Sequence, residues 1–134
     1  MQTLRSIALA AVLVIVLGGR ALAFDEAAFC RQIDAFNARG NAKKGQMVDP
    51  LTRNEGMHAD CQRRTVEFLK SVAVAASELT PPWLAAKQKE WSDLHCKDRV
   101  WSAMMSGGWQ IVLLLATFDG KQLRLVAQCA AGQR

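Results

Sequence analysis

The sequence predicts an α+β domain in which a single antiparallel sheet of about four strands carries helices packed on one face. Three observations lead to this prediction. Two apolar runs flank the dipeptide Asp119-Gly120, which is typical of a β-hairpin. Helical patterns precede and interrupt the predicted strands, as expected for a two-layer domain. Four cysteines in so short a chain indicate a fold stapled by two disulfides.

Residues 1–23 have the features of a secretory signal peptide. Arg5 gives a positive start, a run without charged residues follows from Ile7 to Gly19, and the segment ends in the small-x-small pattern Ala21-Leu22-Ala23. The run is shorter than the roughly 20 apolar residues that span a bilayer, so an uncleaved anchor is the weaker alternative. We therefore expect a periplasmic or secreted protein whose residues 24–134 form one small domain without a stable membrane anchor.

The first helix is expected between Asp25 and Gly40. Asp25 suits the N-cap, and Phe29, Ile33 and Phe36 recur on one helical face. Gly40 suits the residue that follows the end of a helix. A polar link then leads to an Asp-Pro step at residues 49–50, which favours a turn or an extended segment.

Two strands are expected at about residues 52–60 and 64–74. β-branched residues at positions 65, 66, 72 and 74 favour the second strand, in which Lys70 is the exception to the apolar alternation. The spacing of Val66, Leu69 and Ala73 also fits a helix, so the choice between strand and helix for residues 64–79 stays open.

A second pair of helices is expected before the C-terminal hairpin. Thr80 can cap the first of them, and the prolines at 81 and 82 suit its first turn. Leu84, Trp91 and Leu94 fall near one stripe. A shorter helix follows, with apolar Val100, Trp101, Met104 and Met105, and ends at Gly107-Gly108.

The cysteines, Cys30, Cys61, Cys96 and Cys129, all lie after the predicted signal peptide. They allow three pairings. We favour Cys30–Cys61 and Cys96–Cys129, which enclose loops of similar length in the two halves of the chain. No two cysteines are close enough in sequence for a CxxC redox motif.

The charge is modest. Loss of residues 1–23 lowers the formal net charge from +5 to +3, because Arg5 and Arg20 are removed. The basic residues are scattered, and aromatic residues do not alternate with them, so we expect no nucleic-acid partner.

Several short motifs occur in a fixed order: Phe29-Cys30, residues 47–53 (MVDPLTR), Trp91, Cys96, Gly108-Trp109, Asp119-Gly120 and Cys129. With this succession the chain resembles a group of small exported bacterial proteins of unknown function that have four cysteines and an α-ββ-α-ββ layout. The pattern covers nearly all of residues 24–134, although each motif is common alone. The resemblance supports the predicted layout and implies no activity.

The C-terminal hairpin predicts an interaction surface. With Asp119-Gly120 as the centre of a two-residue turn, Val112 pairs with Ala127 and Leu114 with Leu125, and this face becomes the core. The opposite face then presents an apolar strip, which usually indicates an interaction surface, unless an internal segment covers it or the register differs by one residue. The strip comprises Trp109, Ile111, Leu113, Leu115 and Val126.

The predicted function is a non-catalytic exported binding or interaction module of unknown specificity. It would bind an unknown protein or a second copy of itself through this strip. No catalytic residue, cofactor or metal ligand is predicted. The alternative is a small periplasmic enzyme or soft-metal carrier that uses His58 and His95. The four tryptophans are more typical of core packing than of ligand stacking.

Overall fold

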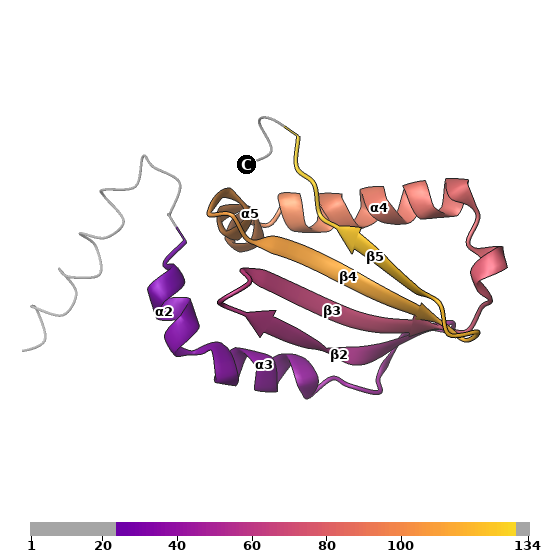
Figure 1. Ribbon diagram of the computed structural model, residues 1–134, viewed down its shortest axis with the longest axis horizontal. Coiled ribbons are helices and arrows are strands. Elements are labelled where there is room, and N and C mark those ends of the chain that lie inside the picture. The colour runs from indigo at the N-terminus through magenta and orange to yellow at the C-terminus, as the bar shows by residue number, and fades with distance from the viewer. Residues whose placement is uncertain (1–23, 131–134) are drawn as a thin grey trace, which may run out of the picture.

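The computed structural model describes residues 24–130, which form one sheet with helices packed against it (Figure 1). The sheet has five strands in the order of the chain: β1 (Met47–Asp49), β2 (Thr52–Asp60), β3 (Thr65–Val72), β4 (Gln110–Thr117) and β5 (Gln122–Val126). The α+β class is confirmed, and the short β1 is the strand that the prediction omitted. The predicted signal peptide lies outside the described residues.

The prediction of a purely antiparallel sheet is wrong, because β3 and β4 pair in parallel at its centre. The other neighbouring strands pair antiparallel. Between β3 and β4 the chain passes through the 3-10 helix η1 (Ala76–Glu78) and the helices α4 (Pro81–Cys96) and α5 (Arg99–Ser106). A parallel pair requires a long crossover of this kind. In the segment 64–79, which the sequence left open between strand and helix, residues 65–72 form strand β3 and residues 76–78 form the 3-10 helix η1.

The hairpin of β4 and β5 is shifted by one residue from the predicted register. Leu113 pairs with Leu125 rather than with Val126. The loop comprises residues 118–120 rather than two residues, and a hydrogen bond of 2.8 Å between the two flanking residues closes it. Gly120 has a φ of +84°, as expected for the third residue of such a loop.

This shift exchanges the predicted faces of the hairpin. Four of the five residues predicted to form an exposed interaction strip are 0–3% exposed and belong to the hydrophobic core: Trp109, Ile111, Leu113 and Leu115. Val126 lies on the opposite face, where it pairs with Val112. The predicted strip is therefore not formed, and a dimer through it would require the core to open.

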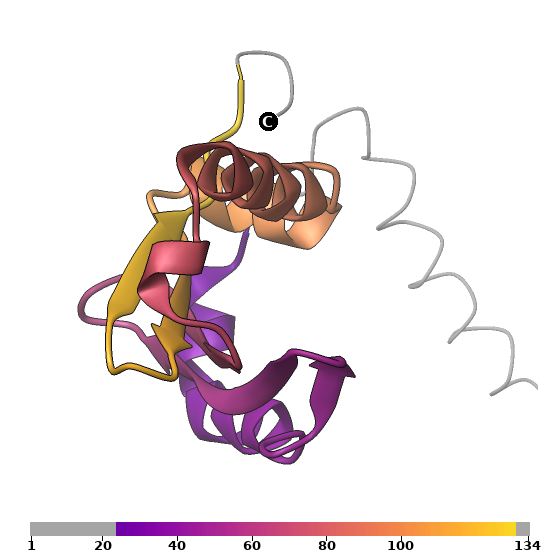
Figure 2. The same ribbon diagram turned by 90° about the vertical axis from the view of Figure 1, so that its right-hand side faces the viewer.

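The other face of β4, called the outer face here, carries residues 110, 112, 114 and 116. Figure 2 shows no helix of residues 24–130 over it. Val112 is nevertheless fully buried. Arg124, which pairs with Leu114, donates a hydrogen bond to the side chain of Gln110 (3.2 Å) and so spans the face beside Val112. The long side chains of neighbouring strands thus cover the second apolar face of β4.

Aromatic side chains join the helices to the core face of the sheet. The ring of Trp91 in α4 packs edge-on against Phe68 of β3 at 5.4 Å, and its Nε1 donates a hydrogen bond to the carbonyl of Ile111 (3.1 Å). Phe29 in α2 (Glu26–Arg31) contacts Trp109 in the same way at 5.3 Å. Edge-to-face packing of this kind adds about 0.5–1.5 kcal/mol to each pair beyond its area burial.

The predicted first helix is broken at Gln32 into α2 and α3 (Ile33–Asn41). Its start is as predicted, because the Asp25 carboxylate accepts a hydrogen bond from the Ala28 N–H (3.0 Å). Gly40 does not end the helix but lies inside α3. A Cβ atom at this position would lie 2.1 Å from the terminal methyl of Met57, so Gly40 permits close packing of α3 on β2.

Two asparagines of α3 cover the edge of β2 that β1 leaves open. The amide of Asn37 accepts the N–H of Ala59 (2.7 Å) and donates to its carbonyl (3.1 Å). Asn41 does the same for Met57, at 3.0 and 2.9 Å. The spacing of Asn37 and Asn41 along the helix matches that of Met57 and Ala59 along the strand. Four helical residues rise about 6 Å, and two strand residues rise about 6.7 Å. α3 therefore satisfies a strand edge with side chains instead of a further strand.

Both disulfides have the favoured pairing. Cys30–Cys61 joins α2 to the turn after β2, and Cys96–Cys129 joins the end of α4 to the segment after β5. They enclose loops of 31 and 33 residues. Closing a loop of this length stabilises a domain by about 3–4 kcal/mol in the chain-entropy description.

Candidate functional site

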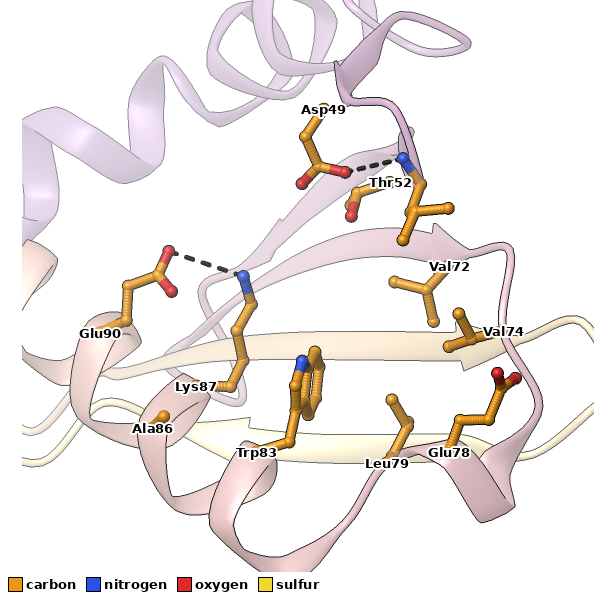
Figure 3. A pocket seen from close by; sticks show the side chains of 11 residues that line it. Asp49, Thr52, Val72, Val74, Glu78, Leu79, Trp83, Ala86, Lys87 and Glu90 are labelled. Atoms are coloured by element: carbon orange, nitrogen blue, oxygen red, sulfur yellow. Dashed lines mark hydrogen bonds and ion pairs between the residues drawn. The ribbon is translucent and has the colours of Figure 1, made fainter.

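A groove lies between α4 and the end of the sheet formed by β1, β2 and β3 (Figure 3). It has a volume of about 270 Å³. Val72 and Val74 lie on the strand side, Leu79 follows η1, and the Trp83 indole stands on the helix side. The groove thus has apolar walls that no other part of residues 24–130 fills.

The sequence of α4 places four residues on the groove. Trp83, Ala86, Lys87 and Glu90 are spaced i, i+3, i+4 and i+7, so they share one face of the helix. The start of α4 is as predicted, because the Thr80 hydroxyl accepts a hydrogen bond from the N–H of Trp83 at 3.4 Å. This cap fixes Trp83 in the first turn, at the mouth of the groove.

Charged groups surround the apolar walls. Lys87 pairs with Glu90 on α4 at 3.5 Å. Asp49 lies across the groove, and a hydrogen bond from the backbone N–H of Leu51 (2.9 Å) lowers the pKa of its carboxyl. Glu78 accepts a hydrogen bond from the N–H of Ala75. The polar side chains that line the groove are thus the Thr52 hydroxyl, the Lys87 ammonium and the carboxylates of Asp49, Glu78 and Glu90.

An exposed apolar segment continues the groove toward β1. Met47, Val48 and Leu51 are 57%, 56% and 53% exposed, and Leu51 also lines the groove. Figure 3 shows Asp49 of β1 across the groove from Lys87 and Glu90 of α4. Exposed apolar side chains next to an apolar groove are typical of a surface that binds another molecule.

None of these groove residues was predicted as a site. The signal was present in part, since Met47, Val48 and Leu51 are apolar residues in an otherwise polar link. Their proximity to Trp83 could not be predicted, because it depends on the parallel pairing that brings α4 over the end of β2 and β3.

The two histidines of the alternative hypothesis lie in different environments. His58 is exposed on the outer face, opposite Glu67. His95 is 3% exposed in the core, where its ring centroid lies 4.1 Å from that of Trp91 and 5.5 Å from that of Trp101. The structure does not bring them together. Within residues 24–130 no group of three His, Cys, Asp or Glu side chains is placed to hold a metal ion.

His95 should make stability depend on pH. Its Nδ1 donates to the carbonyl of Trp91 (2.8 Å), and burial lowers the pKa of the ring from its ordinary value of 6.5. The unfolded chain therefore takes up a proton at higher pH than the folded one. We expect full stability above about pH 6.5 and a loss below it of up to about 1.4 kcal/mol per pH unit. Urea unfolding at about pH 7.5 and about pH 5 measures this loss.

His95→Gln should remove the difference in the free energy of unfolding between the two pH values, whereas His58→Gln should keep that difference. Equal pH dependence in wild type and His95→Gln would assign the effect to other groups.

Two solved structures have a similar fold. No protein-family model matches the chain, and no curated protein is similar in sequence. A "putative secreted protein" from Pseudomonas aeruginosa has a similar crystal structure, with a TM-score of 0.63 at 9% identity over 87% of this chain and 100% of that protein. The pilotin of the Vibrio vulnificus type 2 secretion system matches with a TM-score of 0.50 at 13% identity, over 78% and 94% respectively. At these identities the likeness is one of fold.

None of the helices in residues 24–130 is long and apolar enough to cross a bilayer.

Proposed function

We propose that this chain is an exported, non-catalytic module that binds a partner protein in the groove between α4 and β1–β3. In this proposal residues 1–23 are a cleaved signal peptide, and the mature chain begins at Phe24. The observation that carries it is the unfilled apolar groove beside the exposed residues Met47, Val48 and Leu51.

The compartment is supported by two independent features. Both disulfides are formed, which is typical of proteins that fold outside the reducing cytoplasm. One structural neighbour is described as secreted, and the other is a pilotin of a secretion system. We infer from the second neighbour that this fold can serve an accessory protein of an export machinery.

A polypeptide suits the groove better than an acyl chain does. The walls are apolar, but Glu78, Lys87 and Glu90 stand at the rim. An acyl chain would desolvate these charges without pairing them, which costs free energy. A polypeptide can fill the apolar part with side chains and offer polar groups to the rim, as in most protein interfaces.

Site-specific photocrosslinking in cells that export the full chain tests the proposal. A photoreactive residue at Leu51 or Ala86, which line the groove, should crosslink to one discrete envelope protein. The same residue at Gln122, exposed on the outer face, is the matched control and should not. The intact mass of the exported protein should correspond to a chain that starts at Phe24.

Two results would contradict the proposal. One is the same crosslinked product from Leu51 and Gln122, because the contact would then not be specific to the groove. The other is a crosslink from neither groove position while the outer-face position reacts.

A further inference from the structure

Lys70 is a charged residue on the apolar core face of the sheet. It lies on the central strand β3, two residues from Phe68 and from Val72, and its register neighbours are Asn54 on β2 and Leu115 on β4. Val72, on the same face, lines the groove. Lys70 itself does not line the groove, but its charge acts on three residues that do, Asp49, Lys87 and Glu90, so its side chain lies near the groove.

The ammonium of Lys70 has no carboxylate to balance its charge. Among residues 24–130 no carboxylate oxygen lies within 4.0 Å of its Nζ, which instead faces the Trp91 ring at 5.9 Å from the centroid. Burial lowers the pKa of Lys70, and the nearby charge of Lys87 acts in the same direction. Glu90 and Asp49 oppose these effects only from a distance.

A packing role does not account for a lysine at this position. Of its register neighbours Leu115 is apolar and Asn54 is uncharged, and a methionine of similar length would fill the space without desolvating a charge. A cation facing a ring at nearly 6 Å gains little from it, because the attraction weakens toward that distance. An unpaired, half-buried cation beside an apolar groove is instead complementary to an anion that enters the groove.

We propose that Lys70 is the specificity residue of the groove and pairs with an aspartate or glutamate side chain that the partner segment carries between apolar residues. This inference rests on the proposed function, since it requires a polypeptide in the groove. We expect the carboxylate to come from a side chain rather than from the C-terminus of the partner. A side chain can reach Lys70 from a segment that lies across the rim of the groove, whereas a C-terminal carboxylate would bring its own backbone into the groove. Such a pair would form a charge-assisted hydrogen bond in a partly desolvated site.

Peptide display on the purified, oxidised protein tests the inference. The probe is a random dodecapeptide library fused through its C-terminal end, so no free terminal carboxylate is present. Peptides that bind wild type but not Ala86→Trp, whose larger uncharged side chain fills part of the groove, are retained. We expect them to share one acidic residue flanked by apolar residues. As amidated synthetic peptides, they should lose about 10-fold or more in affinity when that acid is changed to its amide.

Lys70→Met should bind the acidic and the amide peptides equally, and Lys70→Arg should keep the preference for the acid. Lys89→Met is the matched control, because Lys89 lies on α4 outside the groove lining and pairs with Asp93; it should change affinity less than about threefold. Thermal unfolding of each variant shows that the domain is intact.

The outcomes separate the two proposals. Groove-dependent peptides without an acid, or an acid preference that persists in Lys70→Met, would overturn the role of Lys70 and leave groove binding in place. Peptides that bind Ala86→Trp as well as wild type would overturn the groove itself as the site. Saturable binding of dodecanoate that is lost in Ala86→Trp, with no peptide selected, would overturn both in favour of an acyl ligand.

Discussion

Replacement of Leu113 by aspartate is expected to unfold the domain. The side chain is 0% exposed and lies between Phe68 and Leu125 in the sheet. The change loses about 2–3 kcal/mol of apolar burial and places a carboxylate where neither water nor a partner reaches it. The sum exceeds about 5 kcal/mol, which is comparable to the whole stability of a small domain. Circular dichroism and urea unfolding of the refolded, oxidised variant measure the effect.

Leu114→Asp is the matched control. Leu114 is the next residue of β4, but its side chain lies on the outer face, is partly exposed and pairs with Arg124. This variant should remain folded and lose no more than about 2 kcal/mol. A folded Leu113→Asp together with an unfolded Leu114→Asp would instead support the hairpin register predicted from the sequence, in which the two faces are exchanged.

The second large effect is expected at the edge of β2. Asn37→Ala and Asn41→Ala each remove a side chain that satisfies both backbone groups of one β2 residue. Each should cost about 1–3 kcal/mol, because a buried donor and acceptor lose their partners. Alanine is the better helix former, so helix propensity cannot explain a loss. The double variant should also self-associate through the exposed strand edge.

Urea unfolding and light scattering measure these two effects. Arg39→Ala, on the exposed side of α3 between the two asparagines, serves as control and should match wild type within about 0.5 kcal/mol. A monomeric double variant with the control's stability would show that α3 does not protect the edge.

The sequence predicts local features of this fold better than their arrangement. The caps at Asp25 and Thr80 and the existence of both hairpins follow from short-range patterns, whereas the observed disulfide pairing was one favoured option of three. The relative direction of the two hairpins does not follow from such patterns. A crossover through two helices can return the chain parallel or antiparallel to the strand that it left. The hairpin register had a readable signal, since Leu123 and Leu125 alternate in phase with Leu113 once a three-residue loop is allowed.

The candidate site was less predictable than the fold. Its walls come from β1, the end of β3 and α4, which meet only when the sheet has assembled. Lys70 was visible as a break in the alternation of its strand. Whether it faces solvent or an apolar groove depends on which face the helices cover, and the strand alone does not determine this.

Under the export that we propose, the placement of the disulfides bears on how the chain would mature. Each bond joins cysteines that are consecutive along the chain, and neither crosses the central pair of β3 and β4. Cys30 and Cys61 can therefore be oxidised in the emerging N-terminal portion before Cys96 and Cys129 arrive, so vectorial delivery favours the native pairing. The parallel pairing of β3 with β4 has the highest loop-closure cost, because the whole crossover separates the two strands. It can therefore form after both disulfides. Translocation from the N-terminus thus lets a bond-forming catalyst act on one half at a time without isomerisation.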